Sequence, residues 1–277
     1  MKRILVPTDF SKHAEEALKS AVQIAKKNGS EIFLLHLLEL PHQLHDAMTN
    51  GSSIPEVMLF IKKAHEKLQK IKEQPHLQGI TISTTVQFER AFDGILSFNK
   101  KNNIDLIVMG SSGSSGIEEM LIGSNTEKVV RLSDIPVLVV KKDLDTFNIK
   151  NIVFASDFTK EIKKPFLKMI EFANIFDANL ALVMICTPNS FKTTAIAEKT
   201  MKDFIADFEV KNYSINIYND SNIEKGIRNF TNTIGADLIG LCTHGRTGLS
   251  HFFFFFFGED LVNHSTKQVI TFKICFF

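Results

Sequence analysis

Three glycines and two hydroxyl residues form the set whose types and spacing best suit ligand chemistry. Gly110 is followed after two residues by Gly113, and Gly123 and Ser124 come after nine more. Glycine lets the main chain approach a ligand without an intervening Cβ, and hydroxyls such as that of Ser114 donate hydrogen bonds. A helix expected just beyond Gly123 would add its unpaired N–H groups. The spacing predicts a cradle for an anion such as phosphate.

The stretch GSSGSSG, residues 110–116, also has the composition of a flexible linker. The apolar run IDLIVM before it and SNTEKVVRL after it favour a loop inside a folded domain. No lysine follows the glycines as in a Walker motif, and no GxGxxG follows the first apolar run, so these two phosphate-binding motifs are excluded. An anion cradle and a plain loop both stay open on this evidence.

The chain repeats itself once. KRILVPTDFSK at residues 2–12 returns as KNIVFASDFTK at residues 150–160, and residues 103–120 are similar to residues 235–252. Each repeat of about 140 residues has the size of an ordinary domain. The sequence therefore predicts two tandem domains.

Short apolar runs alternate with helical patterns in each half. Apolar residues recur at spacings of three and four between Ser11 and Asn28, which predicts a helix capped by Ser11 and ended at Gly29. The apolar runs lack polar alternation, which is typical of a parallel sheet covered by helices on both faces. We predict an α/β protein of two tandem doubly wound five-stranded parallel-sheet domains, Rossmann-like, at residues 1–141 and 149–277. Ligands bind such sheets at the carboxyl ends of strands, where the glycine set falls.

Composition excludes several classes of partner. The chain has 32 basic and 31 acidic residues, which gives no electrostatic footprint for nucleic acid or an anionic membrane surface. No apolar run reaches the ~18 residues of a membrane span. Cys186, Cys242 and Cys275 lie in apolar contexts without metal-ligand spacing, which favours unpaired thiols in a reducing compartment. We expect a cytoplasmic protein with no metal site.

A family resemblance follows from motifs in a fixed order. ILVPTDFS, LLHLLE, DLIVMGSSGSSG, LIGSNTEKVVR and IPVLVV together resemble the universal stress protein family over essentially the whole first half, and the second half resembles a more diverged copy. The resemblance implies a fold similar to adenine nucleotide alpha-hydrolases. In ATP-binding members the same glycine spacing, followed by Ser or Thr, holds the phosphates. It therefore implies ATP as a cofactor, with or without Mg²⁺.

The resemblance also implies positions for the nucleoside. Asp9, at the end of the first apolar run, would face the adenosine, and the backbone near Leu37 would meet the adenine. The alternative for Asp9 is a turn or capping residue at the start of the next helix. The implied cofactor-binding residues are Pro7, Thr8, Asp9, Leu37, Met109, Gly110, Gly113, Ser114, Gly123, Ser124 and Asn125.

The second half breaks the glycine pattern. Aligned on HGRTG, it has Cys242 where the first half has Gly110, and phenylalanines where the first half has Gly123 and Ser124. Bulky rings leave no bare main chain for a phosphate, so we expect that this domain does not bind ATP in the family's manner. The run Phe252–Phe257 is either a buried filling of the vacated pocket or an interaction surface.

The sequence offers no catalytic arrangement. It has no HExxH, no nucleophile elbow with assignable partners and no paired carboxylates on a recognisable scaffold, so we expect no enzyme and at most slow ATP hydrolysis. The resemblance implies a stress-response regulatory protein that binds an adenine nucleotide in its first domain. A nucleotide-independent, dimerising interaction scaffold is the alternative. Family members dimerise through strand edges, so a homodimer or an intramolecular pseudo-dimer is implied, with an unidentified regulatory protein as a partner.

Overall fold

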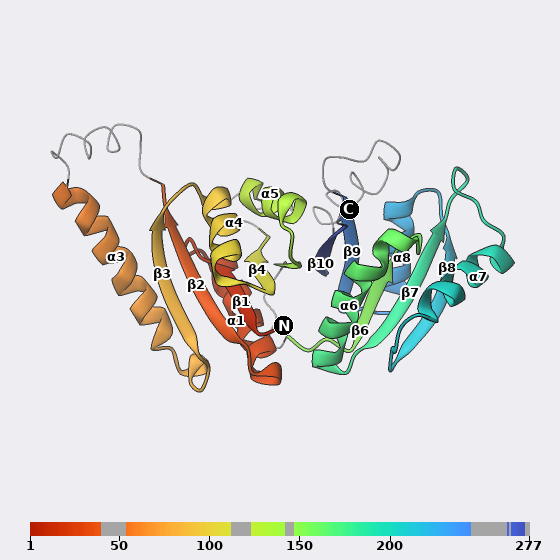
Figure 1. The fold of residues 1–277 in the computed structure, drawn as a ribbon, viewed down its shortest axis with the longest axis horizontal. Coiled ribbons are helices and arrows are strands. Elements are labelled where there is room, and N and C mark those ends of the chain that lie inside the picture. Colours follow the sequence, from red (N-terminus) through yellow and green to blue (C-terminus); the bar gives the residue numbers. More distant parts are fainter. Residues whose placement is uncertain (40–53, 112–122, 142–146, 245–264, 266, 275–277) are drawn as a thin grey trace.

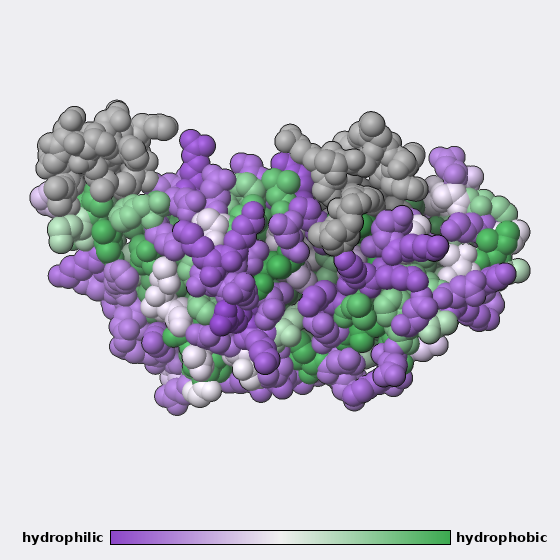
Figure 2. Space-filling view, in the orientation of Figure 1, coloured by the Kyte–Doolittle hydropathy of each residue, from purple (hydrophilic) through white to green (hydrophobic). Residues whose placement is uncertain are grey.

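The structure, a computed structural model, describes residues 1–39, 54–111, 123–141, 147–244, 265 and 267–274 of the chain. Two α/β domains lie side by side along the longest axis of the molecule, with the N-terminus near the middle (Figure 1). Hydrophilic side chains dominate the face shown in Figure 2, and smaller apolar areas are scattered among them.

One sheet runs through both domains. In the described part of the chain its order is β3-β2-β1-β4-β5-β10-β9-β6-β7-β8. The strands are β1 (Arg3–Pro7), β2 (Glu31–Leu38), β3 (Ile82–Phe88), β4 (Leu106–Gly110), β5 (Val137–Val140), β6 (Asn151–Ala155), β7 (Asn179–Cys186), β8 (Tyr213–Asn219), β9 (Leu238–His244) and β10 (Gln268–Ile274). Every neighbouring pair is parallel except β5 and β10, which are antiparallel. The two domains therefore repeat one strand order and meet edge to edge.

Helices cover both faces of this sheet. They are α1 (Lys12–Asn28), α3 (Ile54–Lys72), α4 (Ala91–Asn102), α5 (Ser124–Leu132), α6 (Lys163–Phe176), α7 (Thr194–Ile205) and α8 (Ile223–Thr233), with 3₁₀ turns at Pro75–Leu77 and Lys160–Ile162. Buried residues of α1, α3, α6 and α7 belong to one apolar cluster, and those of α4, α5 and α8 belong to another. Both domains are therefore doubly wound, and the predicted fold class is confirmed.

Local chemistry fixes the ends of α1, the helix that leads from β1 to β2. The Ser11 hydroxyl accepts a hydrogen bond from the amide of Ala14 at 3.3 Å, which satisfies one of the unpaired N–H groups of the first turn. The helix stops at Gly29, whose φ of +70° is the left-handed conformation that glycine adopts without strain. The predicted cap and stop are both confirmed.

The joint between the domains is polar as well as apolar. Val139 on β5 lies opposite Val269 on β10, and both are fully buried. Just beyond β5, the backbone amide of Lys141 donates to the side-chain oxygen of Gln268 at 2.7 Å. Each of the two apolar clusters contains residues of both domains, so the core continues across this joint.

Candidate functional site

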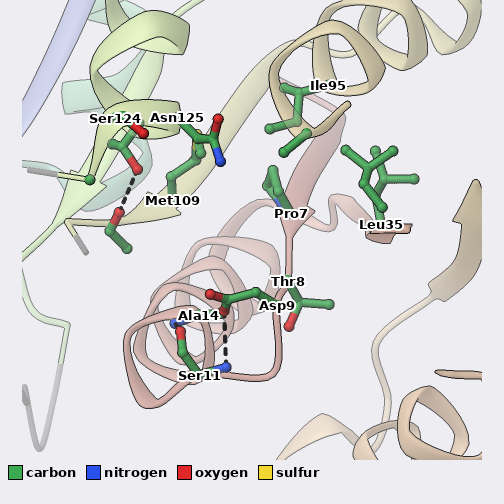
Figure 3. A pocket seen from close by; sticks show the side chains of 15 residues that line it. Pro7, Thr8, Asp9, Ser11, Ala14, Leu35, Ile95, Met109, Ser124 and Asn125 are labelled. Carbon is green, nitrogen blue, oxygen red and sulfur yellow. Dashed lines mark hydrogen bonds between the residues drawn. The ribbon is translucent and has the colours of Figure 1, made fainter. Parts of the chain in front are cut away.

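A cavity of about 240 Å³ opens at the carboxyl ends of β1, β2 and β4, the place where doubly wound sheets bind ligands. Its lining consists of Pro7, Thr8, Asp9, Ser11, Ala14, Leu35, Leu37, Ala91, Ile95, Met109, Gly110, Gly123, Ser124, Asn125 and Thr126. Figure 3 shows Ser124 and Asn125 on one side of this cavity and Asp9 on another. Polar and apolar surfaces contribute about equally to the lining.

The turn after β1 is held by hydrogen bonds from several elements. The amide of Thr8 donates to the carbonyl of Leu35 at 2.8 Å, and the Thr8 hydroxyl accepts from the amide of Phe10 at 3.1 Å. The Asp9 Oδ1 accepts from the amide of Ser11 at 2.9 Å (Figure 3). Asp9 is thus a turn residue, as one interpretation of the sequence had it, and it also lines the cavity. Ser11 rather than Asp9 caps α1.

His36 supports this turn from β2. Its Nδ1 lies 2.7 Å from the carbonyl oxygen of Thr8, so this nitrogen must carry the proton that is donated. Burial lowers the pKa of His36, and its ring lies 4.3 Å from that of Phe10 between centroids. The neutral ring therefore acts as a structural donor that fixes the turn.

The opposite side of the cavity is built where α5 begins. The amide of Ser111 donates to the carbonyl of Val140 at 2.9 Å, and the amide of Gly123 donates to the carbonyl of Ser111 at 2.7 Å. Gly123 is the N-cap, and Ser124 is the first helical residue. The helix therefore begins just beyond Gly123, as expected from the sequence. With Gly123 as the cap, residues 123–126 at the start of α5 line the cavity, and the first amides of a helix have no partner within the helix.

Gly110 has a packing role that its position in a glycine motif did not indicate. A Cβ at this residue would lie 2.6 Å from the carbonyl oxygen of His13, in the first turn of α1. The main chain of β4 therefore approaches α1 more closely than any other residue type allows. The Gly110 carbonyl also accepts a hydrogen bond from the Thr126 hydroxyl at 3.0 Å, which ties α5 to β4.

The apolar side of the cavity comes from β2 and α4. Leu37 lies against Gly94 of α4, where a Cβ would be 2.4 Å from the Leu37 Cδ2. This close approach brings Ala91 and the buried Ile95, both on α4, to the cavity. The sequence analysis missed these two residues, since their position depends on how α4 packs on the sheet.

The structure brings most of the predicted site residues together. Around the cavity lie Pro7, Thr8, Asp9, Leu37, Met109, Gly110, Gly123, Ser124 and Asn125. Gly113 and Ser114 lie outside the described residues. Besides Ala91 and Ile95, the lining residues that were not predicted are Ser11, Ala14, Leu35 and Thr126. A signal for Thr126 was available, because it stands two residues after Ser124 in the same helix start.

The arrangement suits an amphipathic anion. Hydroxyls, a carboxylate and the N-terminus of α5 surround the polar part of the cavity, whereas leucine, isoleucine and methionine side chains form the rest. The positive end of a helix stabilises negative charge, and apolar walls stabilise a flat ring. Among the described residues, no group of three or more His, Cys, Asp and Glu side chains could hold a metal ion.

The second domain differs at the matching positions. Cys242 takes the place of Gly110 and is buried, as is Cys186, and neither forms a disulfide. Burial, and secondarily the charge of Asp157, raises the pKa of Cys242 far above its usual range, so the thiol stays protonated. The run Phe252–Phe257, for which we gave two interpretations, lies outside the described residues. Within those residues, no helix is long and apolar enough to cross a membrane.

Fold and cavity define the chain as a tandem doubly wound α/β protein with a candidate ligand site at the strand ends of its first domain. The model of the universal stress protein family matches residues 1–141. The chain belongs to the universal stress protein family.

Relatives in this family match the first half. Universal stress protein MJ0531 of Methanocaldococcus jannaschii is 34% identical over 142 residues, which cover 51% of this chain and 82% of that protein. Universal stress protein YxiE of Bacillus subtilis is 32% identical over 145 residues, covering 50% and 98% of the two chains. A universal stress protein from Archaeoglobus fulgidus matches 99% of this chain and 98% of its own at a TM-score of 0.78 and 20% identity. The last match shows that the tandem fold is shared over the whole chain.

Proposed function

We propose that the first domain binds ATP or another adenine nucleotide, and that the protein acts as a stress-response regulator. The observation that carries this proposal is that nine residues chosen from the sequence as nucleotide contacts line one cavity of about 240 Å³. Bound nucleotide would bias the contacts of the first domain with an unidentified regulatory protein.

Each part of the nucleotide has a matching surface. The phosphates would lie against Gly123, Ser124 and the first amides of α5, where the helix dipole favours negative charge. The ribose hydroxyls would donate to Asp9, since a carboxylate that accepts one turn amide retains further lone pairs. The adenine would lie beside Leu37 and Ile95. Mg²⁺, if it accompanies ATP, would be held through the phosphates.

We propose binding without turnover. Efficient hydrolysis needs a positioned water and groups that stabilise the charge of the transferring phosphoryl group. The described lining of the cavity includes one carboxylate, Asp9, and it contains no lysine, arginine or histidine. A nucleotide held here would be a regulatory ligand, hydrolysed slowly at most.

Two further features support the wider proposal. The antiparallel pairing of β5 with β10 uses one sheet edge of each domain within the same chain, which favours the intramolecular pseudo-dimer over the homodimer. The buried, unpaired thiols of Cys186 and Cys242 suit the reducing cytoplasm.

The test is to purify the chain, release its bound small molecules with acid, and identify and count them. We expect one adenine nucleotide per chain and a rise in Tm when ATP and Mg²⁺ are added to the stripped protein. Sustained phosphate release would show an enzyme instead. No nucleotide and no thermal shift would favour the interaction scaffold.

A glycine variant makes this test specific to the cavity. Gly123 has φ −61° and ψ 143°, a conformation that β-branched residues adopt readily. Gly123→Val should therefore fold normally, while its side chain covers the start of α5 and abolishes ATP binding. Gly235→Ala in the second domain is the control: its φ of +61° makes alanine cost about 1 kcal/mol of stability, but binding should be unchanged, which separates lost stability from lost binding. Unchanged ATP affinity in Gly123→Val would remove the phosphate cradle from the proposal.

A further inference from the structure

The second domain contains a cavity of its own, about 330 Å³ in volume, at the carboxyl ends of β6 and β7. Its lining includes Asp157 after β6, Met184 and Ile185 on β7, Lys192 in the turn after β7, and Ile223 and Ile227 on α8. Most of its lining surface is apolar, unlike that of the first-domain cavity. A different chemistry of ligand is therefore favoured here.

Two apolar walls face this cavity. One comes from the end of β7, where Met184 and Ile185 are buried in the core. The other comes from the first two turns of α8, through Ile223 and the fully buried Ile227. Gly226 lets α8 lie close to β7, because a Cβ there would be 2.5 Å from the Ile185 Cγ2. The walls can bury a compact apolar or aromatic group.

The side of this cavity formed by the turn after β7 carries a lysine, Lys192. This turn is closed by the amide of Ser190, which donates to the carbonyl of Thr187 at 3.0 Å, and by a bond of 2.8 Å between the two hydroxyls. The turn places Lys192, half-buried, in the lining of the cavity. In the described part of the chain no ion pair joins the Lys192 ammonium to an acidic residue. An ammonium without an acidic partner at an apolar cavity attracts an anionic group.

The described lining of the cavity also contains one carboxylate, that of Asp157. Asp157 follows β6, and its charge acts on Cys242 of β9, whereas Lys192 follows the neighbouring strand β7. Among the described residues, no ion pair joins Lys192 to Asp157. A ligand with a carboxylate at one end and a hydroxyl at the other can pair with Lys192 and donate to Asp157.

We propose that the second-domain cavity binds a small organic carboxylate with an apolar or aromatic body. The carboxylate pairs with Lys192, and the body lies between Met184 and Ile223. The neighbouring Phe191, whose side chain is 71% exposed, adds an aromatic surface beside the rim. This site is independent of nucleotide binding in the first domain.

The test uses 2-naphthoate as the probe on the full-length protein with ¹³C-labelled methionine and isoleucine methyl groups. We expect 2-naphthoate to shift the methyl resonances of Met184, Ile223 and Ile227, while that of Met109 in the first-domain cavity stays in place. The neutral 2-naphthamide should bind about tenfold more weakly, because it lacks the charge that pairs with Lys192. Saturating ATP should not displace the probe.

Matched variants separate the contribution of the Lys192 charge to probe binding from that of the cavity's shape. Lys192→Gln should weaken 2-naphthoate binding about tenfold and leave 2-naphthamide unchanged, whereas Lys192→Arg should retain the affinity. Lys199→Gln, on an exposed position of α7, is the charge control and should bind like the wild type. Ile223→Trp should block both probes by filling the cavity. Equal affinity for the two probes, unaltered binding in Lys192→Gln, or shifts at Met109 alone would each overturn the proposal.

Discussion

The turns that follow β1 and β6 have nearly the same structure, in each case a hydroxyl residue followed by Asp, Phe and a second hydroxyl residue. The Thr8 hydroxyl accepts from the amide of Phe10 at 3.1 Å, and the Ser156 hydroxyl accepts from the amide of Phe158 at 3.0 Å. Both phenylalanines have a positive φ, +64° and +58°, which is uncommon outside glycine. A strained backbone kept in both domains indicates that the turn geometry itself is required at both cavities.

A second pair of residues is shared for a structural reason. Asp105 accepts hydrogen bonds from the amides of Lys2 and Arg3 at 2.6 and 3.0 Å, at the start of β1. Asp237 accepts from the amides of Lys150 and Asn151 at 2.8 and 3.0 Å, at the start of β6. These two aspartates stand at matching places in the sequence repeat. Their similarity reflects the scaffold and gives no information about ligands.

The differences lie where a ligand would touch. In the fourth strand of each domain, Gly110 at the end of β4 is replaced by Cys242 within β9, and the first turn of α1 is replaced by the 3₁₀ turn Lys160–Ile162. One cavity is half polar with the start of a helix beside it, and the other is mostly apolar with a lysine at its rim. The comparison teaches that the two domains share one scaffold, including their turns, while the linings of their cavities differ in polarity and charge.

Exchanging the residues at the ends of β4 and β9 should have the largest effect. Gly110→Cys forces a Cβ within 2.6 Å of the His13 carbonyl oxygen, so the first turn of α1 must move. We expect a loss of about 3 kcal/mol in the free energy of unfolding, measured by urea denaturation, together with loss of ATP binding. The reverse change, Cys242→Gly, leaves a small void and should cost about 1 kcal/mol. Equal costs for the two changes would contradict the different packing of the domains.

Matching lysines beyond β5 and within β10 provide a comparison at the joint between the domains. Burial lowers the pKa of Lys141 from 10.5 to about 8. Because the folded-state pKa lies below the unfolded one, the charged lysine destabilises the fold, and the free energy of unfolding should rise between about pH 8 and about pH 10.5. Lys141→Met should raise stability at neutral pH by on the order of 2 kcal/mol and reduce this rise. Urea unfolding of both proteins at a series of pH values measures the difference, and parallel pH profiles would contradict it.

The aspartates at the two cavities should respond differently to the loss of charge. Asp9→Asn keeps an oxygen that can accept from the amide of Ser11, so the turn should persist while the interaction with ribose hydroxyls weakens. We expect ATP affinity to fall about tenfold in calorimetric titration. Asp157→Asn makes the equivalent change in the second domain and should leave ATP affinity unaltered. A similar loss in both variants would indicate that ATP occupies the second domain as well.

Features of the two domains that depend on residues close together in the chain could be predicted from the sequence. Ser11 and Gly29 mark the ends of α1 because a hydroxyl cap and a left-handed glycine act within one turn of the chain. The start of α5 just beyond Gly123 was expected for the same reason, because the helical run SNTEKVVRL follows this glycine directly. Ile95 was missed because its approach to the cavity depends on the packing of α4 against β2, which no neighbouring residue encodes.

Gly110 shows the same limit. The sequence assigned this glycine to ligand binding, but a Cβ at this position would also clash with the backbone of α1. Contacts of this kind join residues far apart in the chain, and single-sequence patterns do not report them. The place of Lys192 in the second cavity was missed for a related reason, since Lys192 and the residues of α8 line one cavity only after the sheet has formed.

The smallest expected effect concerns the lysine of β10 that matches Lys141. Lys273 donates to Asp134 at 2.6 Å and to the carbonyl of Leu132 at 3.4 Å, and so joins β10 to the end of α5 across the joint. The Asp134 side chain is 56% exposed, and solvent screens such a pair. Lys273→Met should therefore lower the free energy of unfolding by about 0.5–1 kcal/mol, opposite in direction to Lys141→Met. Lys225→Met, on the exposed surface of α8, is the control and should change stability by less than about 0.5 kcal/mol. If both joint lysines shifted stability in the same direction, the contrast between the lysine whose pKa is lowered by burial and the lysine that donates to Asp134 would be wrong.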